Sequence, residues 1–242
     1  MAAARQFLSP ETTAVDVGAN FGIFTSVLAR HSKKVVAFEP NPTCARHLRI
    51  VAPPNCEIIA KAVSDELGVS TLRVPVGSGV AMDALATIAA SNLFDSESRA
   101  TEVFIHSVET TTLDDVLLSP SKPPERVAFI NIDVEGHEFA VLRGGEALLA
   151  AHRPVLLLEL EYRHGAPVVD VFAWLNARRY RPFALLDGHI LASIDAATLR
   201  ALQDDARLAR RLAGNRRSGY LNNVFFIPEG LARAGPRGRT TT

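Results

Sequence analysis

Four titratable side chains lie at the end of one apolar run in the second half of the chain. The run covers residues 127–134, and the side chains belong to Asp133, Glu135, His137 and Glu138. On an extended backbone, Asp133 and Glu135 project to the same side. Carboxylates and an imidazole so placed can remove a proton from a hydroxyl or bind a cation. Asp133, Glu135 and His137 are therefore the candidate catalytic residues.

Each of these residues also has a plainer interpretation. Glu138 stands where a helix is expected to begin, and the helix dipole favours a carboxylate in that first turn. A single histidine is by default structural, so His137 is a structural residue, a general base or a metal ligand. For Asp133 a functional role is favoured, because burial of an acid after an apolar strand costs free energy unless the acid is paired or used.

A second group of polar residues surrounds a glycine-rich turn near the start of the chain. Residues 14–17 form an apolar segment that contains Asp16, and Gly18, Asn20 and Gly22 follow it. Glycines here allow backbone angles closed to other residues and a close approach of a ligand. Residues 23–30 predict a helix, so the turn presents unpaired amides at its N-terminus.

Glu39 ends the next predicted strand, residues 34–38. A carboxylate about 20 residues beyond such a turn suits the two hydroxyls of a ribose. A dinucleotide site requires Gly-x-Gly-x-x-Gly, whereas this chain has Asn20 at the middle position. Asp16 would repel phosphates and attract a cation such as a sulfonium. The pattern favours S-adenosyl-L-methionine, and an NAD-linked oxidoreductase on a Rossmann core is the alternative.

Strand-like and helix-like segments alternate along the chain. This alternation predicts a doubly wound, mostly parallel sheet that positions these residues. Ligands bind such sheets at the carboxyl ends of the strands. The predicted strands are residues 14–17, 35–39, 56–63, 69–76, 127–134, 154–161, 181–186 and 223–227, the last two as an antiparallel edge. The predicted helices are residues 23–30, 43–51, 138–149 and 168–178.

The length fits one domain over residues 1–229. Residues 77–101 interrupt the pattern and form an insertion, either a lid over the site or a surface excursion. Residues 230–242 are expected to be a disordered tail. The cluster of basic residues at 207–217 is interpreted as a solvated helix face.

Composition narrows the class of partner. Lys and Arg number 26 and Asp and Glu 26, so bulk charge gives no reason to expect nucleic acid. Cys44 and Cys56 are the only cysteines and lack metal or redox spacing. No apolar run is long enough for a membrane span and no signal core is present, so a cytoplasmic protein is expected.

Several segments together resemble the FkbM family of class I methyltransferases. Residues 15–22 are similar to the first class I motif, and residues 38–42 to the acidic loop after the second strand. The segments similar to FkbM proteins in particular are residues 62–65, 112–115, 130–138 and 153–159. The family usually has Lys at the position of Asn131. The likeness covers residues 15–161.

The resemblance implies a seven-stranded class I methyltransferase fold that binds S-adenosyl-L-methionine. By position, Gly18, Asn20 and Gly22 would line the methionine and ribose part of the cofactor. Glu39 would hold the ribose hydroxyls. The residues expected near the adenine are Asn41, Val63 and Ser64, the last two at the end of the third strand. With Asp16 and Asp133, these residues form the predicted cofactor site.

The resemblance also implies methyl transfer to a hydroxyl of a sugar, glycan or natural product. A base such as Asp133 or His137 would take the hydroxyl proton during attack. Alternatively, Asp133 and a second acid would bind Mg²⁺ and lower the pKa of the hydroxyl. A non-catalytic protein that binds S-adenosylmethionine is a further alternative. The sequence leaves the acceptor and the oligomeric state open.

Overall fold

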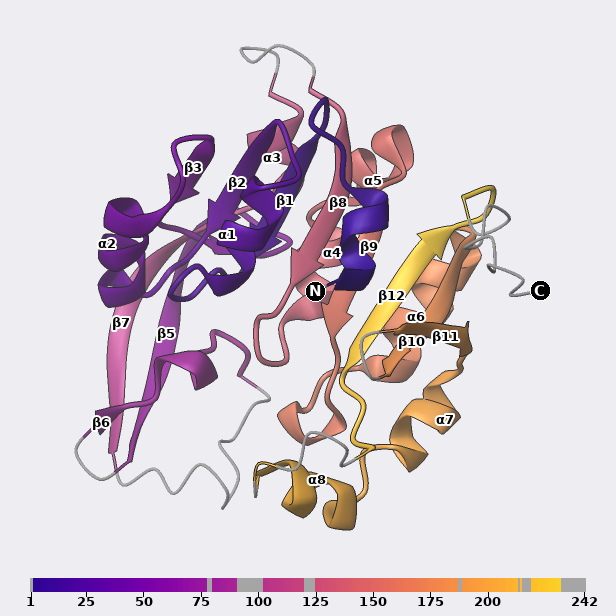
Figure 1. The fold of residues 1–242 in the computed structure, drawn as a ribbon. Coiled ribbons are helices and arrows are strands. Elements are labelled where there is room, and N and C mark those ends of the chain that lie inside the picture. Colours follow the sequence, from indigo (N-terminus) through magenta and orange to yellow (C-terminus); the bar gives the residue numbers. More distant parts are fainter. Residues whose placement is uncertain are drawn as a thin grey trace.

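The computed structural model describes residues 2–77, 80–90, 102–119, 125–186, 189–212, 214 and 219–231. A central sheet runs through the molecule in the strand order β11-β10-β12-β9-β8-β1-β2-β3 (Figure 1). Its strands are β1 (Thr13–Val17), β2 (Lys34–Phe38), β3 (Cys56–Ile59), β8 (Val127–Ile132), β9 (Val155–Glu159), β10 (Tyr180–Leu186), β11 (His189–Ser193) and β12 (Asn223–Pro228).

Strands β3, β2, β1, β8 and β9 are parallel, and β12 and β10 continue the sheet in antiparallel pairing. The predicted doubly wound fold with an antiparallel edge is confirmed. The β10–β11 hairpin adds an eighth strand at that edge. All five residues of β1 are buried, which is expected for a central strand covered on both faces.

Helices cover both faces of the central sheet (Figure 1). Alternate side chains of the strands supply two separate cores, one around Val15 and Ile130 and the other around Ala14 and Phe129. The second core also contains side chains of η1 (Ala2–Phe7), α1 (Ile23–Ala29) and α2 (Pro42–Val51). The first contains side chains of α3 (Leu113–Leu117), α4 (Glu138–Arg143), α5 (Glu146–His152), α6 (Val168–Ala177) and α7 (Ala196–Ala201).

A second sheet has the strand order β4-β7-β5-β6. Its strands are β4 (Ala62–Val63), β5 (Gly68–Gly77), β6 (Val80–Ala81) and β7 (Glu102–Thr111). The prediction of one strand over residues 56–63 is therefore wrong, because the chain turns after Ile59 and β4 pairs with β7 instead of β2. The predicted strand at residues 69–76 is confirmed as part of β5.

Part of the predicted insertion belongs to this second sheet. Residues 80–90 contain β6, the short helix η2 (Asp83–Leu85) and a bridge between Thr87 and Arg73. Residues 91–101 lie outside the described part of the chain, as do residues 232–242 of the predicted tail. The function of the insertion as a lid stays a prediction.

The helix predicted over residues 138–149 is two helices, α4 and α5, with Gly144 and Gly145 between them. A Cβ at Gly144 would lie 2.0 Å from the backbone oxygen of Ser64, and one at Gly145 would lie 2.9 Å from Leu113. The break therefore lets the end of β4 and helix α3 pack directly against the backbone.

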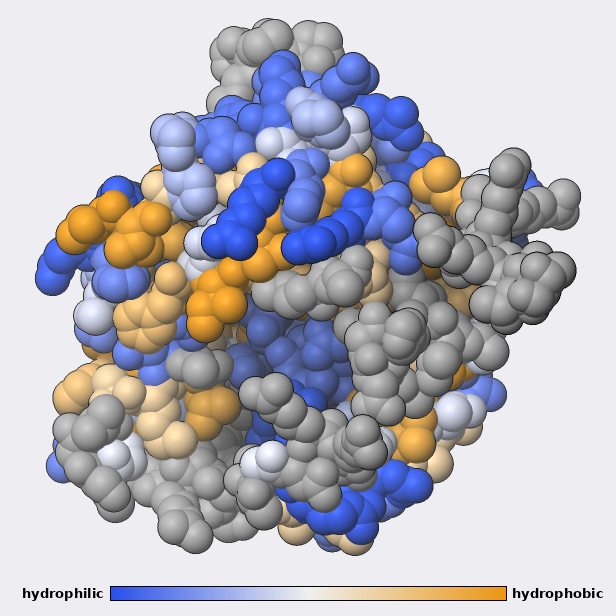
Figure 2. Space-filling model, in the orientation of Figure 1, coloured by the Kyte–Doolittle hydropathy of each residue, from blue (hydrophilic) through white to orange (hydrophobic). Residues whose placement is uncertain are grey.

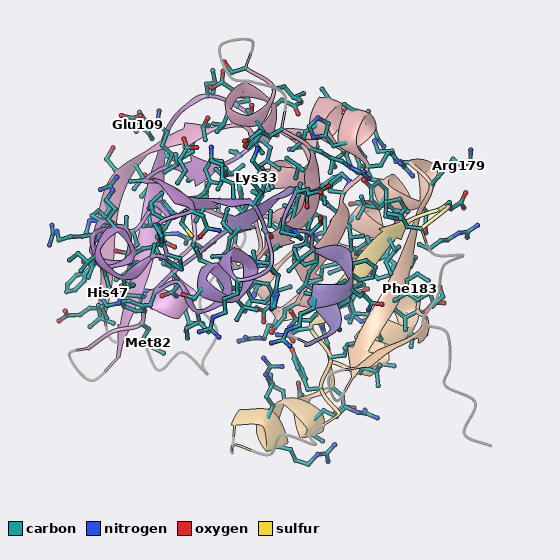
Figure 3. The ribbon with its side chains drawn as sticks, turned by 45° about the horizontal axis from the view of Figure 1, so that its top comes forward. Lys33, His47, Met82, Glu109, Arg179 and Phe183 are labelled. Atoms are coloured by element: carbon teal, nitrogen blue, oxygen red, sulfur yellow. The ribbon has the colours of Figure 1, made fainter. Side chains whose placement is uncertain are left out.

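Charged side chains occupy the periphery of the molecule. Glu109 and Arg179 project outward at opposite edges, and Arg179 forms an ion pair with Glu229 at 2.9 Å (Figure 3). Within the described ranges, every helix is too short or too polar to cross a lipid bilayer.

Candidate active site

A cavity of about 320 Å³ opens at the carboxyl ends of β1, β2, β8 and β9. Figure 2 shows a hollow with hydrophilic residues at its floor near the middle of the face viewed. The predicted site residues that line this cavity are Gly18, Asn20, Glu39, Val63, Asp133, Glu135 and His137. Asp16, Gly22, Asn41 and Ser64 are not among the lining residues. Asn41 and Ser64 contact the lining residues Glu39 and His137, whereas Asp16 and Gly22 lie deeper, against Thr25.

We divide the cavity into a cofactor half, around the loops after β1 and β2, and an acceptor half, around the loops after β8 and β9. Gly18 stands at the boundary, with a φ of 83° that favours glycine. A Cβ at this position would lie 1.8 Å from the backbone oxygen of Asp133. The two halves therefore meet through backbone atoms, and only glycine allows that approach.

In the cofactor half, Glu39 joins the two loops. One carboxylate oxygen accepts a hydrogen bond from the Asn20 amide at 2.6 Å, and the other accepts one from the Asn41 amide at 2.7 Å. Asn20 has a φ of 49°, in the left-handed region. Burial raises the pKa of Glu39 to about 7, and the two amide hydrogen bonds oppose that rise.

Asp16 lies beneath the turn and is fully buried. Its carboxylate accepts hydrogen bonds from the Thr25 hydroxyl at 2.6 Å and from the Asn131 side-chain amide at 2.9 Å. These contacts tie β1 to α1 and to β8. They also give a structural role to Asn131, the position at which the sequence departs from the FkbM pattern.

The second sheet contributes residues that the sequence analysis did not single out. Asp83, from η2, lines the cavity and accepts a hydrogen bond from the Asn41 side chain at 2.6 Å. Asn41 also caps helix α2 through Thr43. Lys61 lines the cavity beside Val63. The N-cap function of Asn41 is readable from Asn-Pro at a helix start, but its partner Asp83 is not.

His137 stands on the cavity wall at the start of α4 and forms a 2.9 Å hydrogen bond between its Nε2 and the Ser64 hydroxyl. Ser64 was predicted to end the third strand, but it follows β4. The second sheet therefore supplies the hydroxyl that binds His137 on the cavity wall. Burial lowers the pKa of His137, and the nearby Asp65 opposes that effect. His137 is therefore a neutral imidazole near neutral pH.

The acceptor half contains a carboxyl pair, Asp133 and Glu159, joined by a side-chain hydrogen bond. Asp133 directly follows β8 and Glu159 ends β9; Ile132 and Leu158, the residues before them, are paired, and both Asp133 and Glu159 line the cavity. Burial and the surrounding carboxylates raise the pKa of both, and that of Glu159 rises well above its usual range. Two such carboxyls hydrogen-bond to each other only when they share a proton.

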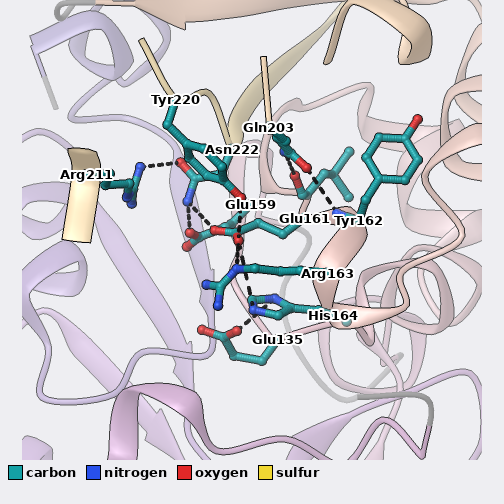
Figure 4. Close-up of polar contacts among 12 residues, drawn as sticks. Glu135, Glu159, Glu161, Tyr162, Arg163, His164, Gln203, Arg211, Tyr220 and Asn222 are labelled. Carbon is teal, nitrogen blue, oxygen red and sulfur yellow. Dashed lines mark hydrogen bonds and ion pairs between the residues drawn. The ribbon is translucent and has the colours of Figure 1, made fainter. Parts of the chain in front are cut away.

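Glu161, two residues after Glu159, is the centre of a polar network (Figure 4). It accepts hydrogen bonds from Tyr220 at 2.9 Å and Asn222 at 2.8 Å, and it forms an ion pair with Arg163. Burial would raise the pKa of Glu161, but Arg163, His164 and Asn222 hold it below its usual value.

The loop after β8 is held to the same network. Glu135 has a φ of 53° and forms a 2.9 Å ion pair with His164, whose pKa is raised by that carboxylate. A Cβ at Gly136 would lie 2.7 Å from the backbone oxygen of His164. The Thr87 hydroxyl donates to the backbone oxygen of Glu135 at 2.9 Å, which connects the second sheet to this loop.

Glu138 lies in the first turn of α4 and is 1% exposed. One carboxyl oxygen accepts a hydrogen bond from the Gly136 amide at 2.9 Å, as expected of a residue that stabilises a helix start. Burial raises the pKa of Glu138 to about 7. Glu138 does not line the cavity.

The acceptor-side residues absent from the prediction are Glu159, Glu161, Arg163, Arg211, Tyr220 and Asn222. Glu159 and Glu161 had a signal, since they end the strand predicted over residues 154–161, at the edge where ligands bind. Arg211 belongs to the basic segment 207–217, for which a solvated helix face was predicted, but it lines the cavity. Arg163 belongs to no motif, and Tyr220 and Asn222 carried no signal because their partners lie 59 to 63 residues away in the sequence. Of the part of the chain that the structure describes, no group of three or more His, Cys, Asp or Glu residues is placed to hold a metal ion, so the arrangement gives no support to the Mg²⁺ alternative.

Comparison with known proteins gives one family match. The model described as "Methyltransferase FkbM domain" matches residues 16–182. No curated protein matches the chain.

Solved structures resemble the chain in fold. A methyltransferase FkbM from Methylobacillus flagellatus KT has a TM-score of 0.52 and 15% identity, over 90% of this chain and 44% of that one. The chain thus spans less than half the length of that protein. An rRNA methylase from Streptococcus thermophilus has a TM-score of 0.41 and 14% identity, over 76% of this chain and 82% of its own.

Proposed function

The chain belongs to the FkbM methyltransferase family, and on that premise we propose that it transfers a methyl group from S-adenosyl-L-methionine to a hydroxyl of a sugar, glycan or natural product. The observation that carries the proposal is the division of one cavity into two halves that meet at Gly18. One half presents backbone turns and a buried carboxylate, and the other presents a carboxyl pair.

The cofactor half fits S-adenosylmethionine. Gly18 lines this half without a side chain, and the Glu39 carboxylate, which also lines it, would accept hydrogen bonds from the ribose hydroxyls. Asn20 would line the methionine part, and Val63 would flank the adenine. In this proposal Asp16, Gly22, Asn41 and Ser64 keep these residues in place from behind, and direct contact of those four with the cofactor stays a prediction.

When bound, S-adenosylmethionine supplies a methyl group already activated by a cationic sulfur. The protein therefore has two tasks, which are to hold the acceptor oxygen in line at roughly 3 Å and to remove its proton. Asp133 is the group we assign to the proton. It ends β8 beside Gly18, at the boundary between the halves, and it lines the cavity.

His137 and Glu135 also line the acceptor side, with secondary roles in this proposal. His137 uses its Nε2 on Ser64 and Glu135 uses its carboxylate on His164. Both contacts orient loops around the acceptor. His137→Ala should then lower turnover less than Asp133→Asn does, and the reverse order would move the base to His137.

The cofactor is tested first, by thermal unfolding with S-adenosylhomocysteine or NADH. A ligand that binds only the native state raises the unfolding temperature. We expect protection by S-adenosylhomocysteine alone, whereas protection by NADH alone would overturn the proposal in favour of the oxidoreductase.

The reaction is tested with S-adenosylmethionine labelled in its methyl group and a panel of glycosides, glycans and hydroxylated natural products. Label transferred to an acceptor oxygen is the expected outcome. Cofactor binding without transfer to any acceptor would favour the non-catalytic binding protein.

A further inference from the structure

Asn222 hydrogen-bonds to both carboxyls at the end of β9, those of Glu159 and Glu161. It is 2% exposed and directly precedes β12. Its side-chain nitrogen donates one hydrogen bond to Glu159 and one to Glu161 (Figure 4). Both N–H groups of the Asn222 amide are thereby used. Its side-chain oxygen accepts from Arg211 at 3.0 Å and from Asn223 at 2.8 Å.

This set of partners fixes the orientation of the Asn222 amide. If the amide were turned over, its nitrogen would face two donors and its oxygen would face two carboxyls. The nitrogen therefore points to Glu159, and the Oε1 atom of Glu159 is an acceptor. A proton on Glu159 must then lie on its other oxygen, Oε2, which is available for the hydrogen bond with Asp133.

The charges around the pair decide which carboxyl keeps the proton. Glu159 is surrounded by the carboxylates of Asp133, Glu135 and Glu161. Asp133 faces Glu135, with Glu138 and Asp16 contributing less. Of the cations nearby, Arg163 and His164 are paired with Glu161 and Glu135, and Arg211 donates to Asn222. Glu159 shares the Asn222 amide nitrogen with Glu161, which is ionised in its pair with Arg163. Ionisation of Glu159 would place a second negative charge at that amide, so Glu159 keeps the proton of the pair.

We propose that Glu159 is a positioning residue that stays protonated and donates its hydroxyl to the Asp133 carboxylate, which thereby remains ionised and aimed at the acceptor hydroxyl. The proposal rests on the proposed function for the identity of the reaction, but the protonation of Glu159 does not depend on it. Asn222 determines which oxygen of Glu159 carries the proton.

The proton balance of the step follows directly. The O–H bond of the acceptor breaks and its proton passes to Asp133, while the oxygen electron pair forms the bond to the methyl carbon. The electron pair of the broken carbon–sulfur bond stays on sulfur. Glu159 keeps its own proton throughout, and Asp133 releases the new one to solvent after the product leaves.

Infrared spectroscopy tests the protonation without any acceptor. At about pH 8.5, Glu39 and Glu138, whose pKa values are about 7, are ionised. We expect the wild-type protein to retain a carboxylic-acid carbonyl band at this pH. Glu159→Gln should remove the part of the band that Asp133→Asn shifts, whereas Glu138→Gln should leave that part unchanged. The buried Asp16, whose pKa is also raised by burial, accounts for a band common to all variants. No loss of band intensity in Glu159→Gln, or no such band in the wild type, would overturn the proposal.

Two substitutions of Glu159 separate positioning from direct proton transfer. Gln retains an oxygen for Asn222 and an N–H donor for Asp133, whereas Ala retains neither. With an acceptor from the panel, we expect Glu159→Gln to keep at least about half of the wild-type turnover. Glu159→Ala should lose about tenfold or more, because Asp133 is no longer held in place. Its pH–rate profile should also shift to higher pH, since an unassisted buried carboxylate takes up its proton more readily.

If Glu159→Gln is as impaired as Glu159→Ala, Glu159 itself takes the proton and the proposal is wrong. Circular dichroism establishes that each variant is folded. Calorimetry with S-adenosylhomocysteine should give the same affinity for all of them. If the wild-type protein does not bind S-adenosylhomocysteine, the proposed function is refuted. The infrared result would still decide whether Glu159 is protonated.

Discussion

The two halves of the cavity hold their polar groups by different means. In the cofactor half, the carboxylate of Glu39 binds backbone amides of the loops that follow β1 and β2. In the acceptor half, side chains bind side chains, as Asn222 does with Glu159 and Glu161. The first arrangement depends on local backbone conformation, and the second depends on how distant strands are brought together.

The two halves should therefore tolerate amino-acid substitutions to different degrees. Backbone amides are present whatever the side chains, so the cofactor half depends on few residues: a glycine that permits close approach and an acid that receives the amides. In the acceptor half, each polar group depends on the identity of its neighbour. Substitutions there should change chemistry more than cofactor affinity, and the reverse should hold in the cofactor half.

Asp133→Asn should have the largest effect on turnover. The variant keeps the size of the side chain but cannot accept a proton, and loss of a general base typically costs about 10²–10⁴-fold. Affinity for S-adenosylhomocysteine should change much less. Turnover is measured with the labelled cofactor and affinity by calorimetry. Equal losses in both would abolish the distinction between the halves.

Gly18→Ala should be the most damaging change in the cofactor half. The added Cβ would collide with the Asp133 carbonyl oxygen, and the φ of 83° adds strain of about 1–3 kcal/mol. We expect lower stability in urea denaturation and lost cofactor binding. Gly230→Ala is the matched control, since its φ is 103° and nothing lies within 4 Å of its Cβ. If both variants lose the same stability, the clash with Asp133 is not the cause.

Glu39→Gln should weaken S-adenosylhomocysteine binding by about tenfold to a hundredfold. One side-chain oxygen becomes an NH₂ group that opposes an amide donor from Asn20 or Asn41, and hydrogen bonds to charged groups contribute about 1.5–3 kcal/mol. Glu57→Gln, on β3 outside the cavity, serves as the control. Calorimetry that finds no difference between the two variants would remove Glu39 from the cofactor site.

Glu138→Gln should have the smallest effect and should appear only in the pH dependence of stability. The pKa of Glu138 is raised from 4.5 to about 7 in the folded protein, so between these pH values the native state keeps a proton that the unfolded chain loses. Its contribution to stability is therefore present at low pH and falls as pH rises, by at most about 1.4 kcal/mol per pH unit.

The variant should reduce the pH dependence of stability by this contribution, while the contributions of Glu39 and Asp133, whose pKa values are also about 7, remain. Urea denaturation at about pH 5 and pH 7 measures it, with the exposed Glu11→Gln as control. An unchanged slope in Glu138→Gln would mean that Glu138 is already ionised in the folded protein.

Sequence was informative where a few consecutive residues determine the geometry. The turn from Gly18 to Gly22 and the acid at Glu39 belong to adjacent loops, so their spacing was sufficient to place both at one edge of the sheet. The mostly parallel sheet was predicted from the alternation of strands with helices. Asp133, Glu135 and His137 were found because they follow a strand directly.

Sequence was uninformative where a contact depends on tertiary packing. Nothing near Lys61 indicates that the chain leaves the central sheet after Ile59, because residues 56–63 are uniformly suited to a strand. Gly144 and Gly145 were read as part of one helix, although the end of β4 requires the break. Asn222 has no motif, since its partners are set by the pairing of β12 with β9.

The second sheet leaves and rejoins the rest of the molecule at nearly the same point. Ala62, where it begins, is paired with Thr110, and the Ser64 amide bonds to the backbone oxygen of Thr111, where it ends. A segment with adjacent ends can change in length or be exchanged for another while the central sheet keeps its register. Because Thr87 from this segment lines the cavity and binds the loop that contains Glu135, such exchange would give the proposed base, Asp133, a different choice of acceptor. The second sheet is thus the natural place to graft new specificity onto this chain.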